Sequence, residues 1–154
     1  MRIFRYEYQS PVGKLFLEAS ETGLRGLYFR KPEGHFSTDP SVSAIILKTV
    51  DQLEEYFRGE RRNFDVPLEA GGTEFQKKVW GALSEIPYGK TCSYTSIARK
   101  IKNDKAVRAV GTANGANPIS IIVPCHRVIA ADGTLGGYGG GLEIKSRLLE
   151  IEHQ

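Results

Sequence analysis

The first seventy residues change from a strand-like pattern of apolar positions to a helical one. Residues 2–8 alternate polar and apolar side chains, and two further strand candidates, 14–20 and 24–29, follow after turn residues. Apolar residues then recur at helical spacing across residues 42–57, and residues 63–68 offer a last short strand. The pattern predicts a small α+β unit over residues 1–70 that gathers no cluster of catalytic side chains.

The second half begins with a helix signal. Thr73 and Gln76 have the spacing of a capping box, and the apolar positions that follow them line one helical face as far as Ile86. Ser93 is suited to cap a further short helix at residues 95–100. The Gly-rich segment before Thr73 is the natural linker, so a second unit is expected over residues 73–154.

A second short helix is expected at residues 105–113, after a polar turn. Two short helices joined in this way are typical of a helix-turn-helix. The small side chains of the second helix would equally permit close packing between two helices. Lys105 and Arg108, near its start, favour contact with a DNA backbone.

The β-branched run from Ile119 to Val123 predicts a buried strand that Pro124 ends. Cys125 and His126 follow at once, so a thiol that can act as a nucleophile stands beside an imidazole that can take its proton. The alternative is a cysteine that only packs, next to a histidine satisfied by the backbone. Because neighbouring side chains on an extended chain point to opposite faces, we expect no direct contact between the two.

Two features near the C-terminus add candidate chemistry. Residues 135–141 place Tyr138 among five glycines, where the backbone can approach a ligand and a flat ring can stack, although a flexible spacer has the same composition. A helix is expected from Leu142 to Ile151. Glu152 at its end is either solvated or the third member of a Cys-His-Glu relay.

Composition excludes several classes of protein. The chain has 154 residues and two cysteines, too few for a disulfide framework, and no clustered Cys/His set suggests a metal. No apolar run approaches a membrane span, and the N-terminus lacks the apolar centre of a signal peptide. We expect an intracellular protein, cytoplasmic or, in a eukaryote, nuclear, without a cofactor and without a membrane partner.

The net charge of +3 is unevenly distributed. Residues 1–72 hold 10 Lys/Arg against 11 Asp/Glu, whereas residues 73–154 hold 11 against 7. Five of these cations fall between Arg99 and Arg108. Such a cluster fits phosphate binding, although a solvated helix face produces the same pattern.

Taken together, the motifs of the second half resemble the O6-alkylguanine-DNA alkyltransferases, also called methylated-DNA–protein-cysteine methyltransferases. The matching motifs occur in the family's order and spacing between residues 87 and 152: Pro-Tyr-Gly-Lys-Thr-x-Ser-Tyr, Arg-Ala-Val-Gly, Ala-Asn-Pro, Ile-x-Ile-Ile-Val-Pro-Cys-His-Arg-Val-Ile, Gly-Gly-Tyr-x-Gly-Gly and Lys-x-x-Leu-Leu-x-x-Glu. The resemblance implies an α+β fold. A small ribonuclease-H-like N-terminal domain at residues 1–70 would precede a mostly helical, winged-helix-like domain at 73–154 that contains the helix-turn-helix.

The resemblance also implies a reaction. Cys125 would accept one alkyl group from O6-alkylguanine, or from O4-alkylthymine, after minor-groove binding and nucleotide flipping. His126 would deprotonate the thiol through a water, Glu152 would hold the imidazole, and Asn117 would be the hinge to the recognition helix. The protein would act once, as a monomer, on double-stranded DNA.

The family's remaining roles fall on the DNA surface and the base pocket. Arg108 would be the finger that fills the space left by the flipped nucleotide, with Lys105 on the backbone. The other residues implied for these surfaces are Ala109 and Gly111 against the groove, Tyr94 at the target phosphate, and Val128, Tyr138, Gly139 and Lys145 at the guanine pocket.

Two departures and two alternatives accompany this interpretation. Residues 1–72 contain no cysteine for the zinc set of some relatives, and Gly139 replaces a serine seen in some members. A non-catalytic lesion-binding relative would carry Trp in place of Cys125. A transcription factor would need large polar base readers on the second helix, where this chain has small and apolar residues.

Overall fold

The chain divides into two compact units, and the computed structural model describes residues 1–153 of it. One unit covers Met1–Gly71, and the other begins at Gly72. Both combine helices with small sheets, which confirms the expected α+β class. Among residues 1–153, no helix is both long enough and apolar enough to cross a bilayer.

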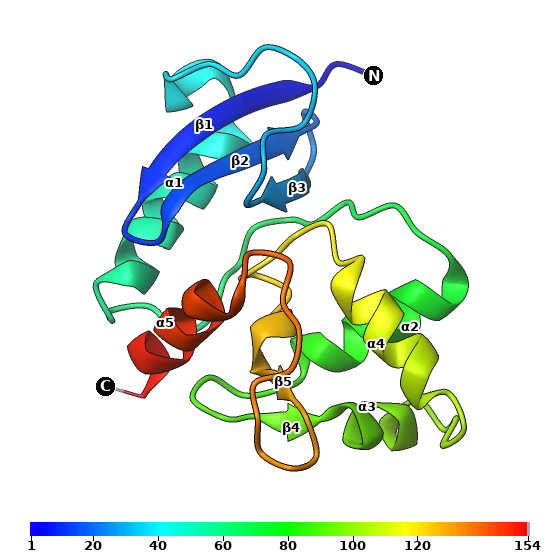
Figure 1. The fold of residues 1–154 in the computed structure, drawn as a ribbon. Helices are drawn as coiled ribbons and strands as arrows, with labels where there is room; N and C mark the ends of the chain where they lie inside the picture. Colours follow the sequence, from blue (N-terminus) through cyan, green and yellow to red (C-terminus); the bar gives the residue numbers. More distant parts are fainter. Residues whose placement is uncertain (154) are drawn as a thin grey trace. The chain divides into compact units, whose positions relative to one another are not determined.

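The first unit is built on a three-stranded antiparallel sheet (Figure 1). Its strands are β1 (Phe4–Ser10), β2 (Gly13–Ala19) and β3 (Leu24–Tyr28), in the order β1-β2-β3. Gly13 ends the β1–β2 turn with φ 105°, a conformation that favours glycine, and its carbonyl accepts a hydrogen bond from the Ser10 hydroxyl at 2.6 Å. The period-two pattern therefore predicted these strands correctly.

One helix covers a face of this sheet. α1 (Ala44–Phe57) contacts all three strands and buries Ile46, Leu53 and Tyr56 completely. A short 3₁₀ turn, η1 (Pro40–Val42), precedes it. The helical spacing thus identified α1 to within two residues of its start.

The strand expected at residues 63–68 is wrong. Leu68 forms only an isolated bridge with Leu24, whose amide donates to the Pro67 carbonyl at 2.8 Å. Pro67 has no amide hydrogen to donate, so a full ladder cannot form along this segment.

The described part of the second unit combines four helices with a sheet of two very short strands. The helices are α2 (Glu74–Ser84), α3 (Tyr94–Lys100), α4 (Val107–Gly115) and α5 (Leu142–Glu152). Strands β4 (Cys92–Ser93) and β5 (Val128–Ile129) pair in parallel. The sequence pattern did not indicate this pair, because two residues are too few to show a period.

The helix-turn-helix is present as α3 and α4, which contact each other and α2. The Ser93 side chain caps α3 by accepting from the Ser96 amide at 3.1 Å. α4 begins two residues later than expected and ends at Gly115. The Trp80 indole on α2 donates to the Ala113 carbonyl at 2.9 Å and so fastens α4 to the core.

The buried strand expected at residues 119–123 is also wrong. The segment is buried, but it folds as a turn in which the Val123 amide donates to the Ile119 carbonyl at 3.0 Å. Ile121 has φ 72°, which is unusual for a β-branched residue. A buried run of apolar residues is compatible with either backbone, because the side chains report burial and not where the backbone hydrogen bonds go.

The α2 cap offers a test of the second unit's stability. The Thr73 hydroxyl accepts a hydrogen bond from the Gln76 backbone amide at 3.1 Å, and the Gln76 side-chain oxygen accepts one from the Thr73 backbone amide at 2.9 Å. We expect Thr73→Ala to lower the free energy of unfolding by about 1 kcal/mol, since one helix-end donor loses its partner. Urea unfolding measures this. Thr91→Ala, at an exposed position, serves as the control, and equal stability of both variants would contradict the cap's role.

Candidate functional site

A pocket of about 260 Å³ opens beside Cys125 in the second unit. It forms where the end of α4, the buried turn before Cys125 and the Gly-rich segment after β5 come together. Its volume suits a ligand of about the size of one base. The lining residues are Tyr94, Gly111, Asn114, Gly115, Asn117, Ser120, Cys125, Gly137, Tyr138 and Gly139.

Cys125 begins a 3₁₀ turn, η2 (Cys125–Arg127), directly after Pro124. The cysteine is 4% exposed and His126 is fully buried. The expectation of an extended backbone at this point is therefore wrong, because the chain turns tightly here. The buried turn, rather than a strand end, places the thiol at the pocket.

Burial dominates the electrostatics of the thiol. It raises the pKa of Cys125, while hydrogen bonds with the Asn117 and Tyr138 side chains and the positive charge of Lys145 act in the opposite direction. Cys125 is therefore a neutral thiol near pH 7. A nearby base is needed to make it a nucleophile.

His126 is placed to be that base. Its Nε2 lies 2.7 Å from Oε2 of Glu152, on the last turn of α5. Burial lowers the pKa of His126, and the carboxylate of Glu152 only partly opposes this. The neutral ring therefore donates from Nε2 to the carboxylate. Its Nδ1 is buried and has no partner among the described residues, so its lone pair can accept a proton.

Arg127 completes this buried group, and the sequence alone assigned it no specific partner. Its Nε donates to Oε1 of Glu152 at 2.8 Å and its Nη2 to Oε2 at 3.1 Å. Its Nη1 donates to the Ile86 carbonyl at 2.7 Å, and its guanidinium lies over the Tyr88 ring. The one signal in the sequence was its position two residues after Cys125.

Asn117 holds the buried turn with both ends of its amide. Its Nδ2 donates to the Val123 carbonyl at 2.8 Å, and its Oδ1 accepts from the Ile119 amide at 3.0 Å. These two bonds replace the strand ladder that the turn lacks. The asparagine thereby connects the end of α4 to the segment that carries Cys125.

Lys145 of α5 fixes the Gly-rich segment from behind. Its ammonium is fully buried and donates to the carbonyls of Val128 at 2.6 Å, Leu135 at 2.5 Å and Gly137 at 3.3 Å. Burial lowers the pKa of Lys145, and the Cys125 thiolate would raise it. Val128 and Lys145 thus lie behind the pocket wall, whereas Tyr138 and Gly139 line the pocket.

Four lining residues were not expected from the sequence. Asn114 and Gly115 follow Gly111 by three and four positions on α4, so the helical period could have placed them on the same face. Ser120 and Gly137 carry no such signal, because the turn and the loop that present them have no regular period.

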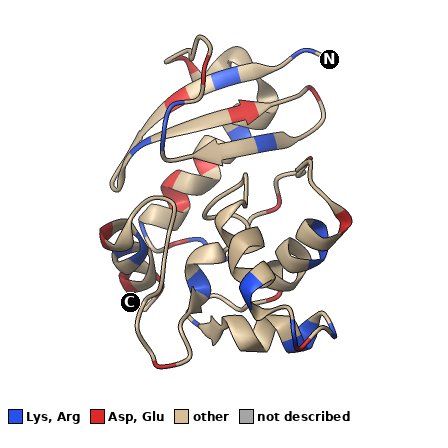
Figure 2. Ribbon diagram, turned by 45° about the vertical axis from the view of Figure 1, so that its right-hand side comes forward, with Lys and Arg blue, Asp and Glu red and all other residues tan. Residues whose placement is uncertain are grey.

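The cations expected to contact DNA lie on α3, α4 and the turn between them, as Figure 2 shows. Lys105, Arg108 and Ala109 are exposed. Lys100 also pairs with Glu85 at 3.3 Å. Gly111 is half-buried, and a methyl group there would lie at an ordinary van der Waals distance, 3.9 Å, from the Tyr94 ring, so the packing of α4 beside Tyr94 does not itself require glycine at this position.

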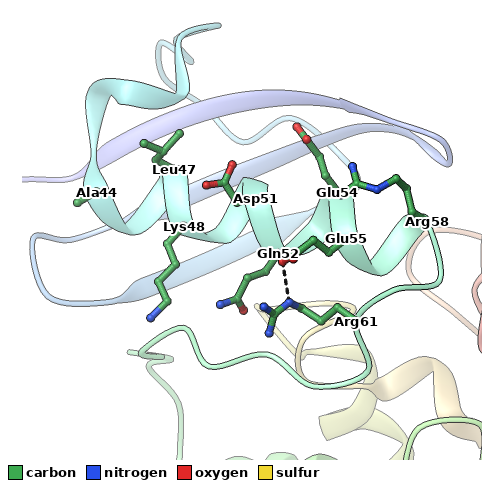
Figure 3. A pocket seen from close by; sticks show the side chains of 9 residues that line it. All are labelled: Ala44, Leu47, Lys48, Asp51, Gln52, Glu54, Glu55, Arg58 and Arg61. Carbon is green, nitrogen blue, oxygen red and sulfur yellow. Dashed lines mark hydrogen bonds and ion pairs between the residues drawn. The ribbon is translucent and has the colours of Figure 1, made fainter.

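A larger hollow, of about 620 Å³, lies along α1 in the first unit (Figure 3). Several of its charged side chains are in ion pairs: Arg61 pairs with Glu55 at 2.9 Å, and Lys48 pairs with Asp65 at 3.5 Å. Its lining includes no Cys, His, Ser or Thr. The pocket at Cys125 is therefore the candidate site.

Comparison with protein families gives two matches that together span nearly the whole chain. Residues 3–70 match the ribonuclease-like domain, and residues 74–154 the DNA-binding domain, of 6-O-methylguanine DNA methyltransferase. A Methanosarcina acetivorans protein named methylated-DNA–protein-cysteine methyltransferase is 50% identical over 148 residues, covering 94% of this chain and 95% of that protein. A Mycolicibacterium paratuberculosis protein of the same name is 57% identical over 150 residues, covering 94% and 89%.

Solved structures agree with these matches. The crystal structure of Mycobacterium tuberculosis O6-methylguanine methyltransferase has a TM-score of 0.89 at 46% identity, covering 99% of this chain and 93% of that one. The structure of Mycobacterium tuberculosis OGT in complex with DNA has a TM-score of 0.90 at 48% identity, covering 97% and 92%. The resemblance to this family and the fold class expected from the sequence are thus confirmed.

The Asn117 bonds can be tested through stability. We expect Asn117→Ala to lower the free energy of unfolding by about 1–3 kcal/mol, because a buried carbonyl and a buried amide both lose their partner. Chemical denaturation measures the change. Asn103→Ala is the matched control at an exposed position, where about 0.5 kcal/mol or less is expected. Similar losses in both variants would mean that the turn holds without Asn117.

Proposed function

Because the chain belongs to the 6-O-methylguanine DNA methyltransferase family, we propose that it repairs DNA by moving an alkyl group from O6-alkylguanine to Cys125. The observation that carries this proposal is the buried thiol at a base-sized pocket, next to a histidine whose Nδ1 is unoccupied and whose Nε2 is held by Glu152. The basic helix-turn-helix belongs to the same unit.

The DNA surface supplies the access that the buried thiol needs. A base stacked in a duplex hides its O6 atom, so the nucleotide must leave the helix, at a cost of a few kcal/mol. Exposed Lys105 and Arg108 neutralise phosphates, and Arg108 fills the space that the nucleotide vacates. Ala109 and Gly111 let α4 approach the minor groove closely. The chain acts as a monomer on duplex DNA.

The reaction moves one proton and one alkyl group. His126 takes the thiol proton at Nδ1 through a water, and Glu152 stabilises the imidazolium that forms. The sulfur of Cys125 then forms a bond to the alkyl carbon as the bond from that carbon to O6 breaks. The electron pair goes to the guanine, which takes up a proton. The product is a thioether, which no step of this chemistry reverses, so each molecule acts once.

The pocket wall would hold the flipped nucleotide. Tyr94 faces the pocket from the first turn of α3 and orients the target phosphate and sugar, Tyr138 offers a ring for stacking, and the backbone of Gly139 offers a donor for O6. Lys145 acts on this wall indirectly, because its bonds to the Val128 and Gly137 carbonyls fix the loop.

The two alternatives explain less of the site. A lesion-binding protein without transfer would have no use for a thiol held against a histidine relay. A transcription factor would need base-reading side chains on α4, where the exposed residues include Arg108 and Ala109 and the helix is otherwise rich in small side chains.

Alkyl transfer should occur once and at one sulfur. After incubation with a duplex that contains O6-methylguanine, we expect the protein to gain a single methyl group on Cys125 and none on Cys92. Burial raises the pKa of Cys92, and no histidine is among the groups that shift it. Intact-mass measurement and peptide mapping decide this. Repeated turnover, or label on Cys92, would contradict the proposal.

Arg108→Ala should separate nucleotide flipping from chemistry. We expect repair of the duplex lesion to slow on the order of 10-fold or more, because the variant no longer offsets the unstacking cost. Reaction with free O6-benzylguanine should be nearly unchanged, since no base has to leave a helix. Rates of Cys125 alkylation on both substrates measure this, with Lys14→Ala in the first unit as a control for lost surface charge. Equal losses on both substrates would assign Arg108 to the fold or the pocket.

A further inference from the structure

Arg127 is buried, with 7% of its surface exposed, and its guanidinium makes hydrogen bonds to groups inside the protein. Its Nε and Nη2 donate to the two carboxylate oxygens of Glu152, and its Nη1 donates to the Ile86 carbonyl. The ring of Tyr88 lies against its guanidinium. Tyr88 in turn donates from its hydroxyl to the Ile151 carbonyl at 3.2 Å, next to Glu152. The guanidinium is therefore positioned by the Ile86 carbonyl and the Tyr88 ring, in addition to its hydrogen bonds with the carboxylate.

The position of Glu152 requires such a partner. The carboxylate is 4% exposed, and a buried carboxylate without a cation takes up a proton at a higher pH than usual. A protonated Glu152 would no longer balance a positive charge on His126. A carboxylate held by His126 alone would also be free to rotate, because one hydrogen bond fixes only one of its two oxygens.

From this geometry we infer that Arg127 is a positioning residue of the alkyl-transfer site, one that locks the Glu152 carboxylate in place as an anion and keeps His126 neutral until the thiol gives up its proton. The inference rests on the proposed function, since it concerns the same relay. Arg127 itself does not line the pocket and acts through Glu152.

Two separate properties of the guanidinium explain how Arg127 fixes the Glu152 carboxylate and how it keeps His126 neutral. Its fork of donors matches both carboxylate oxygens and fixes where Oε2 meets His126. Its charge opposes a second positive charge on the neighbouring imidazole and is one cause of the lowered pKa of His126, after burial. Lysine in its place would keep the charge and lose the fork, whereas methionine would lose both.

The charges that face His126 are few. Glu152 and Lys145 come from α5, and Arg127 comes from the same turn as the histidine. α2 also packs against this turn, but its charged residues Glu74, Lys77 and Lys78 are exposed. Removing Arg127 therefore leaves Lys145 as the one positive charge among the groups that shift the pKa of His126, so the histidine–glutamate pair should take up a proton at higher pH.

The experiment measures the titration of His126 and the rate of alkyl transfer in the same three proteins: the full chain, Arg127→Lys and Arg127→Met. The chain has three histidines, and the exposed His35 and His153 serve as internal references in a nuclear magnetic resonance titration of the ring protons. Rates are taken with free O6-benzylguanine, so that DNA binding does not enter. Arg30→Met, at an exposed position, is the matched control.

We expect the His126 signal to titrate in Arg127→Met at a pH higher than in the full chain by about one unit or more, as for loss of a charge at close range. In Arg127→Lys the titration should stay near that of the full chain. Transfer at pH 7 should nevertheless slow on the order of 10-fold, because a well-placed base contributes about 10²–10⁴-fold. Arg30→Met should match the full chain in both measurements.

Two results would overturn the inference. One is an unchanged His126 titration in a folded Arg127→Met, and the other is an unchanged transfer rate in Arg127→Lys. If Arg127→Met does not fold, the rate of Arg127→Lys still decides the positioning role. Failure of the proposed function would look different, since the full chain would then gain no alkyl group on Cys125, regardless of the pH at which His126 titrates.

Discussion

The buried carboxylate of Glu152 is the group on which the active end of the second unit depends. It meets His126 at 2.7 Å and Arg127 at 2.8 Å, and so joins the last turn of α5 to the turn that carries Cys125. A buried ion is stable only when it is paired and hydrogen-bonded, and losing one partner of such a pair typically costs about 3–5 kcal/mol. The placement of the C-terminal helix and the placement of the relay are thus one structural requirement.

Burial sets the charge state of the thiol and of the imidazole in the resting site. In the proposed reaction the alkyl group of a flipped base has to reach a buried thiol, and this burial raises the pKa of Cys125 and lowers that of His126. Both shifts favour the uncharged pair, so the resting site holds a thiol and a neutral imidazole. In the proposed reaction, charge separates only when the proton moves, and the carboxylate of Glu152 and the ammonium of Lys145 would then stabilise the imidazolium and the thiolate respectively.

Much of the second unit follows from local chemistry. The Thr73–Gln76 capping box and the Ser93 cap mark α2 and α3 because their bonds span three residues. The elements that depend on distant partners were missed or wrong. β4 pairs with β5 across more than thirty residues, and the segment from Ile119 to Val123 is a turn because the Asn117 side chain satisfies its backbone in place of a neighbouring strand.

The sequence by itself determined the kinds of chemistry available: a thiol, an imidazole and a guanidinium in succession, a late glutamate, a glycine-rich segment around Tyr138, and a basic pair of short helices. Only the tertiary structure decided which of these meet. Glu152 lies 26 residues from His126 and 25 from Arg127, so no local period relates them. The tertiary structure also places Asn114 and Ser120 in the pocket wall. They line the same pocket as Cys125 because α4, the buried turn and the loop held by Lys145 surround one cavity, and that arrangement depends on packing between distant segments of the chain.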